Sequence, residues 1–183
     1  MSKLQALTMA ARFSAHIAWE ALARPRPHDL SAIPPTLNAI TREWLGAALC
    51  AGHAEARVDS FDMSRGSQGT TSRAALKIHY NAAGRAAGLP EQLFVKMTPK
   101  LTSRLVCGLS GALASECGFH QHVRIGLKLE APRAFFNAWD ARSCRSAILF
   151  EDIATTRGCE FLNTEALITR AQAEDMVGVL ASL

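Results

Sequence analysis

The segment from Thr71 to Tyr80 limits the possible folds of this chain most strongly, because apolar and polar residues alternate along it. Such alternation is typical of a strand that turns one side to a core and the other to water, as in antiparallel sheets. A second strand-like segment, Glu55 to Ser64, precedes it, and a short loop with two glycines joins the two. The residues expected on the buried side are Ala74, Leu76, Ile78 and Tyr80. The pattern therefore predicts a β-hairpin within an antiparallel sheet.

Other segments show the spacing of helices or further strands. Two more strands are predicted at Gln92 to Met97 and at Ala147 to Ile153. The predicted helices are residues 3–23, Arg42 to Ala51 with Thr41 as N-cap and Gly52 as terminator, about Ser110 to Val123, and a C-terminal helix for which Thr164 can be the N-cap. This mixture of helices and antiparallel strands predicts the α+β class.

The N-terminal helix leaves two interpretations open. Its apolar residues recur at helical spacing, and it has only one acidic residue, Glu20. An Ala-rich helix of this kind usually packs on its own domain, whereas an acid-poor helix with arginine is also compatible with a presequence or a helix on a membrane surface. We expect the helix to pack on its own domain, through the face formed by Leu4, Leu7, Ala11, Ala15, Ala18 and Leu22.

Charge and cysteine content exclude several classes of function. The 183 residues carry a net charge of +4 with no run of five like charges, and this argues against nucleic acid as a partner. The five cysteines are widely spaced and never form a CxxC motif, so neither a disulfide framework nor a zinc site is predicted. No apolar run is long enough to span a membrane, which makes a membrane partner improbable and a cytoplasmic location the expectation.

Four features then follow one another in an informative order. They are a Gly-x-x-Gly loop between two strands, a lysine within the next strand, a glutamate on the next helix, and an apolar strand that ends in two acids. Glycine and small hydroxyl residues let backbone N–H groups approach phosphate oxygens, and a lysine held by a helix-borne carboxylate supplies positive charge. We expect Lys96 and Glu116 to form that pair, with the end of the apolar strand offering backbone groups to a nucleotide base.

These residues resemble the aminoglycoside phosphotransferase and choline-kinase-like family, which includes the ecdysteroid-kinase-like proteins. The resemblance spans roughly residues 35 to 183. It lies in the segments Ile40-Thr41-Arg42-Glu43-Trp44-Leu45, Gly66-Ser67-Gln68-Gly69-Thr70-Thr71-Ser72, Leu93-Phe94-Val95-Lys96, Ser115-Glu116-Cys117-Gly118-Phe119, Ala131-Pro132 and Ile148-Leu149-Phe150-Glu151-Asp152-Ile153.

The resemblance implies a protein-kinase-like N-terminal lobe that binds ATP. It implies that the nucleotide is bound by the loop Gly66 to Ser72, by Lys96 with Glu116, and by the hinge Phe150, Glu151, Asp152 and Ile153. Residues 35–153 would then form the lobe, residues 1–34 a helix and Pro-rich linker, and residues 154–183 the start of a C-terminal lobe. Family members use ATP and magnesium to phosphorylate a hydroxyl group of a small molecule.

One departure from the family affects the expected activity. The family places its catalytic aspartate in an HxDxxxxN-type loop, but none of the six histidines here is followed two positions later by aspartate. No Asp-x-Asp or Asp-Phe-Gly motif occurs either. We therefore expect a truncated chain that binds ATP but is nearly inactive alone, with magnesium ligands and the small-molecule acceptor site in the missing lobe. The alternative is a non-catalytic interaction module, or a pseudokinase lobe that needs a partner.

The individual residues also have simpler interpretations. The Gly-x-x-Gly sequence is often only a hairpin turn, and Lys96 on an edge strand would reach water without binding anything. Glu130 lies further along the chain as a second candidate partner for Lys96. In the family interpretation the backbone groups of Glu151 and Asp152 contact the base, so their side chains matter less for nucleotide binding.

Overall fold

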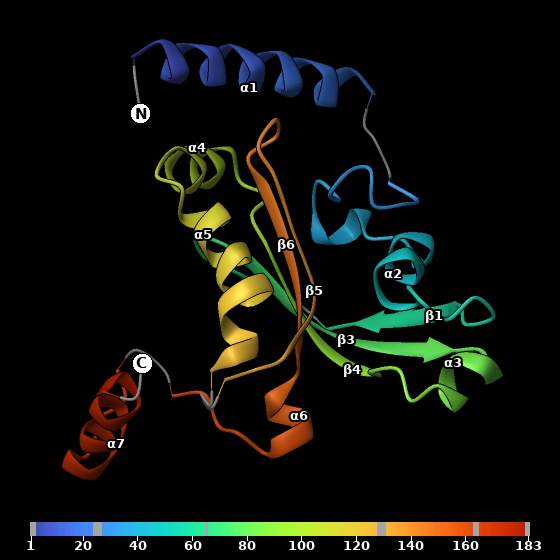
Figure 1. Ribbon diagram of the computed structural model, residues 1–183, viewed down its shortest axis with the longest axis vertical. Helices are drawn as coiled ribbons and strands as arrows, with labels where there is room; N and C mark the ends of the chain where they lie inside the picture. The colour runs from blue at the N-terminus through green and yellow to red at the C-terminus, as the bar shows by residue number, and fades with distance from the viewer. Residues whose placement is uncertain (1–2, 24–26, 65, 128–130, 163–164, 182–183) are drawn as a thin grey trace.

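The computed structural model describes residues 3–23, 27–64, 66–127, 131–162 and 165–181. It has an α+β fold built on one antiparallel sheet, as the sequence predicts (Figure 1). The strand order is β1-β3-β4-β6-β5, with the short strand β2 paired to β3 off this path. The strands are β1 (Val58–Met63), β2 (Ser67–Gln68), β3 (Ser72–Tyr80), β4 (Gln92–Met97), β5 (Ala134–Asp140) and β6 (Arg145–Glu151). The helices are α1 (Lys3–Ala23), η1 (Leu37–Ala39), α2 (Arg42–Leu49), α3 (Ala82–Ala86), α4 (Leu101–Leu109), α5 (Ala112–Gly118), η2 (Phe119–Val123), η3 (Arg124–Gly126), α6 (Ile153–Arg157) and α7 (Arg170–Ala181).

The predicted hairpin is confirmed in β1 and β3. The four apolar positions named for β3 are each no more than 3% exposed, so the alternation identified the buried face correctly. The strand β1 is shorter than predicted, because Glu55 to Arg57 lie outside it. The loop between the strands contains a strand that was not predicted, since Ser67 and Gln68 pair with β3. The strand β4 has the predicted bounds.

Helix α2 covers one face of the sheet and forms the main core with it. The N–H of Trp44 donates to the Thr41 side-chain oxygen at 3.1 Å, which confirms Thr41 as the N-cap. The helix ends at Leu49, and Gly52 takes a positive φ of 85° in the turn that follows. The buried face of α2 is Trp44, Leu45, Ala48 and Leu49. These side chains pack with those of β3, β4 and β6 that face the same way.

Helix α5 lies on the other face of the sheet, against β5 and β6 (Figure 1). The single helix predicted from Ser110 to Val123 is wrong in its bounds. The backbone of Gly111 takes a positive φ of 78°, which only glycine adopts at little cost, and it separates α4 from α5. After Gly118 the helix widens into the π-helical turn η2 and then narrows into η3. Helix α4 was not predicted.

The last strand also differs from its prediction. Strand β6 begins at Arg145 and ends at Glu151, whereas the sequence predicted a strand from Ala147 to Ile153. Asp152 precedes helix α6, and its carboxylate accepts a hydrogen bond from the Thr155 hydroxyl at 2.9 Å. The two residues after Glu151 therefore leave the sheet instead of extending it.

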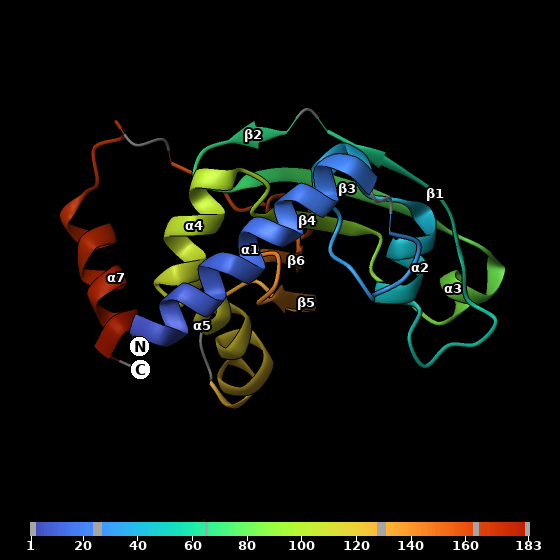
Figure 2. The ribbon, with the colours of Figure 1, turned by 90° about the horizontal axis from the view of Figure 1, so that it is seen from above.

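Helix α1 packs on its own domain, but not through the face that was predicted. Five residues of the predicted apolar stripe are exposed, namely Leu7, Ala11, Ala15, Ala18 and Leu22, with Leu7 69% and Leu22 87% accessible. The helix instead buries Phe13 and directs Glu20 toward Arg104 of α4 and Arg145 of β6. Figures 1 and 2 show α1 crossing above α4, on the same side of the molecule as the β5–β6 turn.

Helix α7 confirms the predicted C-terminal helix, although it begins only at Arg170. No residue of α7 is buried, and the helix lies beside the sheet and not over it (Figure 1). The proposed cap Thr164 and the alternative lysine partner Glu130 lie outside the described residues. None of the helices in the described part of the chain is long and apolar enough to cross a membrane.

Candidate functional site

The face of the sheet opposite α2 carries two neighbouring rows of side chains. Directly paired residues on adjacent strands point to the same face, so the register defines each row. Arg73 of β3 pairs with Lys96 of β4, and we call these two residues the cationic row. The next row along the strands, the apolar row, joins Ala75 of β3, Phe94 of β4 and Phe150 of β6.

Lys96 and Glu116 form an ion pair between β4 and α5. Their side chains are 24% and 29% exposed, so both are partly removed from water. The sequence selected this pair because a lysine in an otherwise apolar strand needs a carboxylate, and α5 brings Glu116 to it. A pair at this depth contributes about 1–2 kcal/mol, between the values for exposed and buried ion pairs.

A small apolar cleft of about 260 Å³ lies beside this pair. Lys96 and Glu116 contribute polar groups to its lining, together with the end of β6. Its volume is just below the roughly 300 Å³ at which small-molecule sites begin, so it fits a ring-sized part of a ligand. The ring side chains in its lining are Phe94, His120, Pro132, Phe150 and Phe161.

His120 was not singled out for this site by its sequence, yet it forms part of the cleft. Its ring meets that of Phe150 edge to face, with the centroids 4.8 Å apart. Burial lowers the pKa of His120, and the nearby Lys96 and Arg124 act in the same direction, whereas Glu116 opposes them. The buried Nδ1 atom has no hydrogen-bond partner among the described residues. The ring is therefore a neutral wall of the cleft near pH 7.

The hinge residues Phe150 to Ile153 form the far end of the cleft. The Glu151 N–H donates to the Arg133 carbonyl at 2.8 Å, and the Asp152 N–H donates to the Gln92 carbonyl at 3.2 Å. Hydrogen bonds from Arg157 lower the pKa of Glu151 to about 2, so this carboxylate is ionised and held by α6. The strand end is consequently less open than the sequence suggested, because two of its amides are already bonded.

The glycine loop is divided between the two faces of the sheet. Ser67 pairs with Arg73 and so extends the cationic row, and Thr71 accepts a hydrogen bond from Arg73 Nε at 3.1 Å. Ser72 is buried and pairs with Met97, which puts it on the α2 face, away from Lys96. The residues of the loop at the surface are Gly66, Ser67, Gly69 and Thr70, and Gln68 pairs through its backbone with Ser72.

The two glycines of this loop have different structural roles. A Cβ at Gly66 would lie 2.9 Å from the Arg73 carbonyl oxygen and 2.9 Å from Leu37 Cδ1, so this glycine allows close packing. A Cβ at Gly69 would meet nothing within 4 Å. A Cβ is therefore tolerated at Gly69 but not at Gly66, although Gly66 also lines, with Ser72 and Lys100, a hollow of about 710 Å³.

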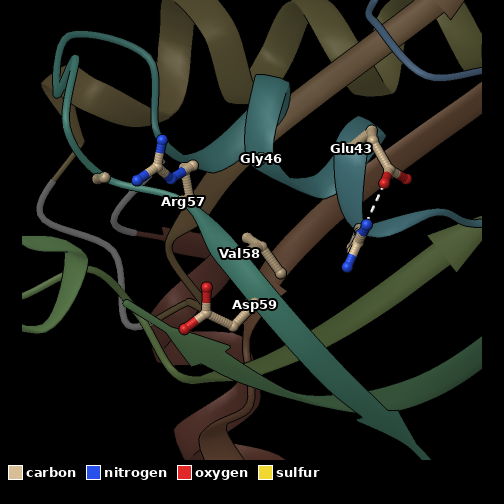
Figure 3. A pocket seen from close by; sticks show the side chains of 7 residues that line it. Glu43, Gly46, Arg57, Val58 and Asp59 are labelled. Carbon is tan, nitrogen blue, oxygen red and sulfur yellow. Dashed lines mark hydrogen bonds and ion pairs between the residues drawn. The ribbon is translucent and has the colours of Figure 1, made fainter. Parts of the chain in front are cut away.

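A larger hollow of about 650 Å³ lies between α2 and β1, away from these residues (Figure 3). Asp59 lines it from β1, and Arg57 lines it from the segment before that strand. The charge of Arg42 is already matched by Glu43, whose carboxylate lies 2.7 Å from Arg42 Nε. None of the residues that the sequence selected for nucleotide binding lies in this hollow. It is a shallow charged surface, whereas the Lys96 cleft combines a charge pair with an apolar wall.

No group of three or more histidine, cysteine or acidic side chains that could hold a metal ion exists within the described residues. Glu116 is taken up by Lys96, and Glu151 by Arg157. These two carboxylates are therefore already engaged by basic side chains. No family model, curated protein or solved structure matches this chain.

Proposed function

We propose that this chain is the ATP-binding lobe of a small-molecule phosphotransferase, with a protein-kinase-like N-terminal lobe. One observation carries the proposal: the Lys96–Glu116 pair lies where the cationic row meets an apolar cleft on one face of the sheet. A nucleotide has two corresponding parts: a flat apolar base, which matches the cleft, and a polyphosphate, which matches the cationic row. The strand order and the helix-borne glutamate agree with the resemblance to the aminoglycoside phosphotransferase and choline-kinase-like family.

Each part of the site has a defined task in this proposal. The base packs on the rings of Phe94 and Phe150, which lie side by side on β4 and β6. The amide of Ile153, which donates in none of the backbone bonds of the described residues, is available to it. Lys96, oriented by Glu116, meets the phosphates. Bound ATP supplies the phosphoryl group that the family transfers to a hydroxyl of a small molecule.

The chain alone is proposed to bind ATP without transferring phosphate. Its sequence has no HxDxxxxN loop to position and deprotonate an acceptor hydroxyl, and its described residues offer no magnesium ligands. The magnesium and acceptor sites would come from a C-terminal lobe, and the acceptor then determines the reaction.

The test is nucleotide binding by wild type and by Lys96→Ala, measured by isothermal titration calorimetry. We expect wild type to bind ATP weakly and Lys96→Ala to lose at least tenfold in affinity, because a charged phosphate contact is removed. Lys77→Ala is the matched control, since Lys77 is an exposed lysine on the same face of β3 and lies opposite Gln92. Equal affinity in wild type and Lys96→Ala would contradict the proposal.

The second candidate is a non-catalytic interaction module, which the exposure of α7 favours. Its apolar side chains Met176, Val177 and Leu180 are 58%, 64% and 67% exposed. Apolar surface of this kind is typical of a site that a partner covers. This candidate predicts self-association through α7 that Val177→Lys weakens, measured by light scattering. A monomer in wild type would count against it.

A further inference from the structure

Arg73 is the second member of the cationic row, and it came to light only through the register of the sheet. It pairs directly with Lys96, so the two side chains leave the same face of the sheet. Paired residues on antiparallel strands have Cβ atoms about 4.5–5.5 Å apart. The two side chains are therefore near enough to contact one bound anion together.

Only one of the two positive charges in the cationic row has an anionic partner. Glu116 neutralises Lys96, so this pair brings no net charge to a ligand. Arg73 is exposed and belongs to none of the ion pairs within the described part of the chain. Its guanidinium is therefore the unpaired positive charge of the cationic row.

The guanidinium of Arg73 is also held in place. Its Nε donates to the Thr71 side-chain oxygen at 3.1 Å, and Thr71 is itself only 8% exposed. This bond uses one donor and leaves the two terminal nitrogens for another acceptor. A planar guanidinium fixed in this way suits the paired oxygens of a phosphate.

We propose that Arg73 is a second phosphate-binding residue, through which the site selects nucleoside di- and triphosphates over monophosphates and nucleosides. This inference rests on the proposed nucleotide function. Ala75 and the rest of the apolar row lie one same-face step, about 6.6 Å, from Arg73 along β3. A base in the cleft thus directs its phosphates toward the cationic row, and each added phosphate brings charge closer to Arg73.

The test compares adenosine, AMP, ADP and ATP as ligands of wild type and Arg73→Ala, by calorimetry at low salt without magnesium. Wild type should bind ATP more tightly than adenosine, with affinity rising along the series. Arg73→Ala should lower the affinity for ATP about tenfold and that for adenosine less than twofold, which flattens the series. Arg73→Lys should restore part of the loss, because it keeps the charge but not the planar fork.

Two controls separate binding from folding. Lys77→Ala removes a cation from the same face of β3 and should leave all four affinities unchanged. The melting temperature of unliganded Arg73→Ala should stay within about 2 °C of wild type, because Arg73 is exposed and belongs to none of the ion pairs of the described residues.

The outcomes distinguish this inference from the function on which it rests. Equal ATP affinity in wild type and Arg73→Ala, with a loss in Lys96→Ala, overturns the role of Arg73 and leaves the nucleotide function standing. An equal loss for adenosine and ATP in Arg73→Ala also overturns it, because it indicates a general structural defect. If wild type binds neither ATP nor adenosine, both proposals fail.

Discussion

At the scale of single residues, Gly66 shows how the loop that resembles a phosphate loop is also a packing element. Its Cα faces the backbone of β3 and the side chain of Leu37, and a methyl group there would meet both at 2.9 Å. Gly66→Ala should therefore lower the free energy of unfolding by about 1–3 kcal/mol, because a backbone carbonyl has little room to move. Urea denaturation measures the change.

Gly69→Ala is the matched control for this prediction. It makes the same chemical change three residues further on, where a Cβ meets nothing within 4 Å. Its effect should stay within about 0.5 kcal/mol, as for most surface substitutions. If both variants lowered the free energy of unfolding equally, the close contacts at Gly66 would not be the cause of its loss.

At the scale of secondary-structure elements, one carboxylate fastens α1 to the rest of the molecule. Glu20 accepts hydrogen bonds from Arg104 at 3.0 Å and from Arg145 at 2.8 Å, and both arginine side chains are no more than 7% exposed. The Arg104 guanidinium also lies over the Phe13 ring, 5.0 Å from its centroid. Glu20→Ala should cost about 3–5 kcal/mol of stability, since it leaves two buried cations unpaired. Leu22→Ala on the same helix, where the side chain is exposed, should change nothing measurable.

The same carboxylate gives the stability of the protein a dependence on acid. Burial acts to raise the pKa of Glu20, but the hydrogen bonds and charges of Arg145 and Arg104 outweigh it and hold the pKa below its usual 4.5. The unfolded state thus takes up the proton first, and the contribution of Glu20 is present above pH 4.5 and lost as pH falls through the lowered value. The stability difference between wild type and Glu20→Gln, measured by urea denaturation, should shrink as pH falls below 4.5. A difference independent of pH would contradict the assignment.

At the scale of the whole molecule, the two terminal helices contribute unequally to the fold. Helix α1 buries Phe13 and pairs Glu20 with Arg104 of α4 and Arg145 of β6, whereas α7 has no buried residue. Removing residues 170–183 should therefore cost less than about 1 kcal/mol, while removing residues 3–23 should cost several kcal/mol. Thermal unfolding of the two deletion variants compares them. The division of the chain at residues 34 and 153 stays a prediction.

The sequence by itself determined the features that depend on neighbours within a few residues. The alternation in β3, the bounds of β4 and the Thr41 cap all follow local rules of periodicity and capping, and Lys96 stands out because a charge interrupts an apolar strand. The tertiary structure alone decided which residues meet across long separations. Glu20 meets Arg145, 125 positions away, and Arg73 faces Lys96 only because β3 and β4 pair in one particular register. Such contacts depend on how buried surfaces fit together, and no local pattern in the chain encodes that fit.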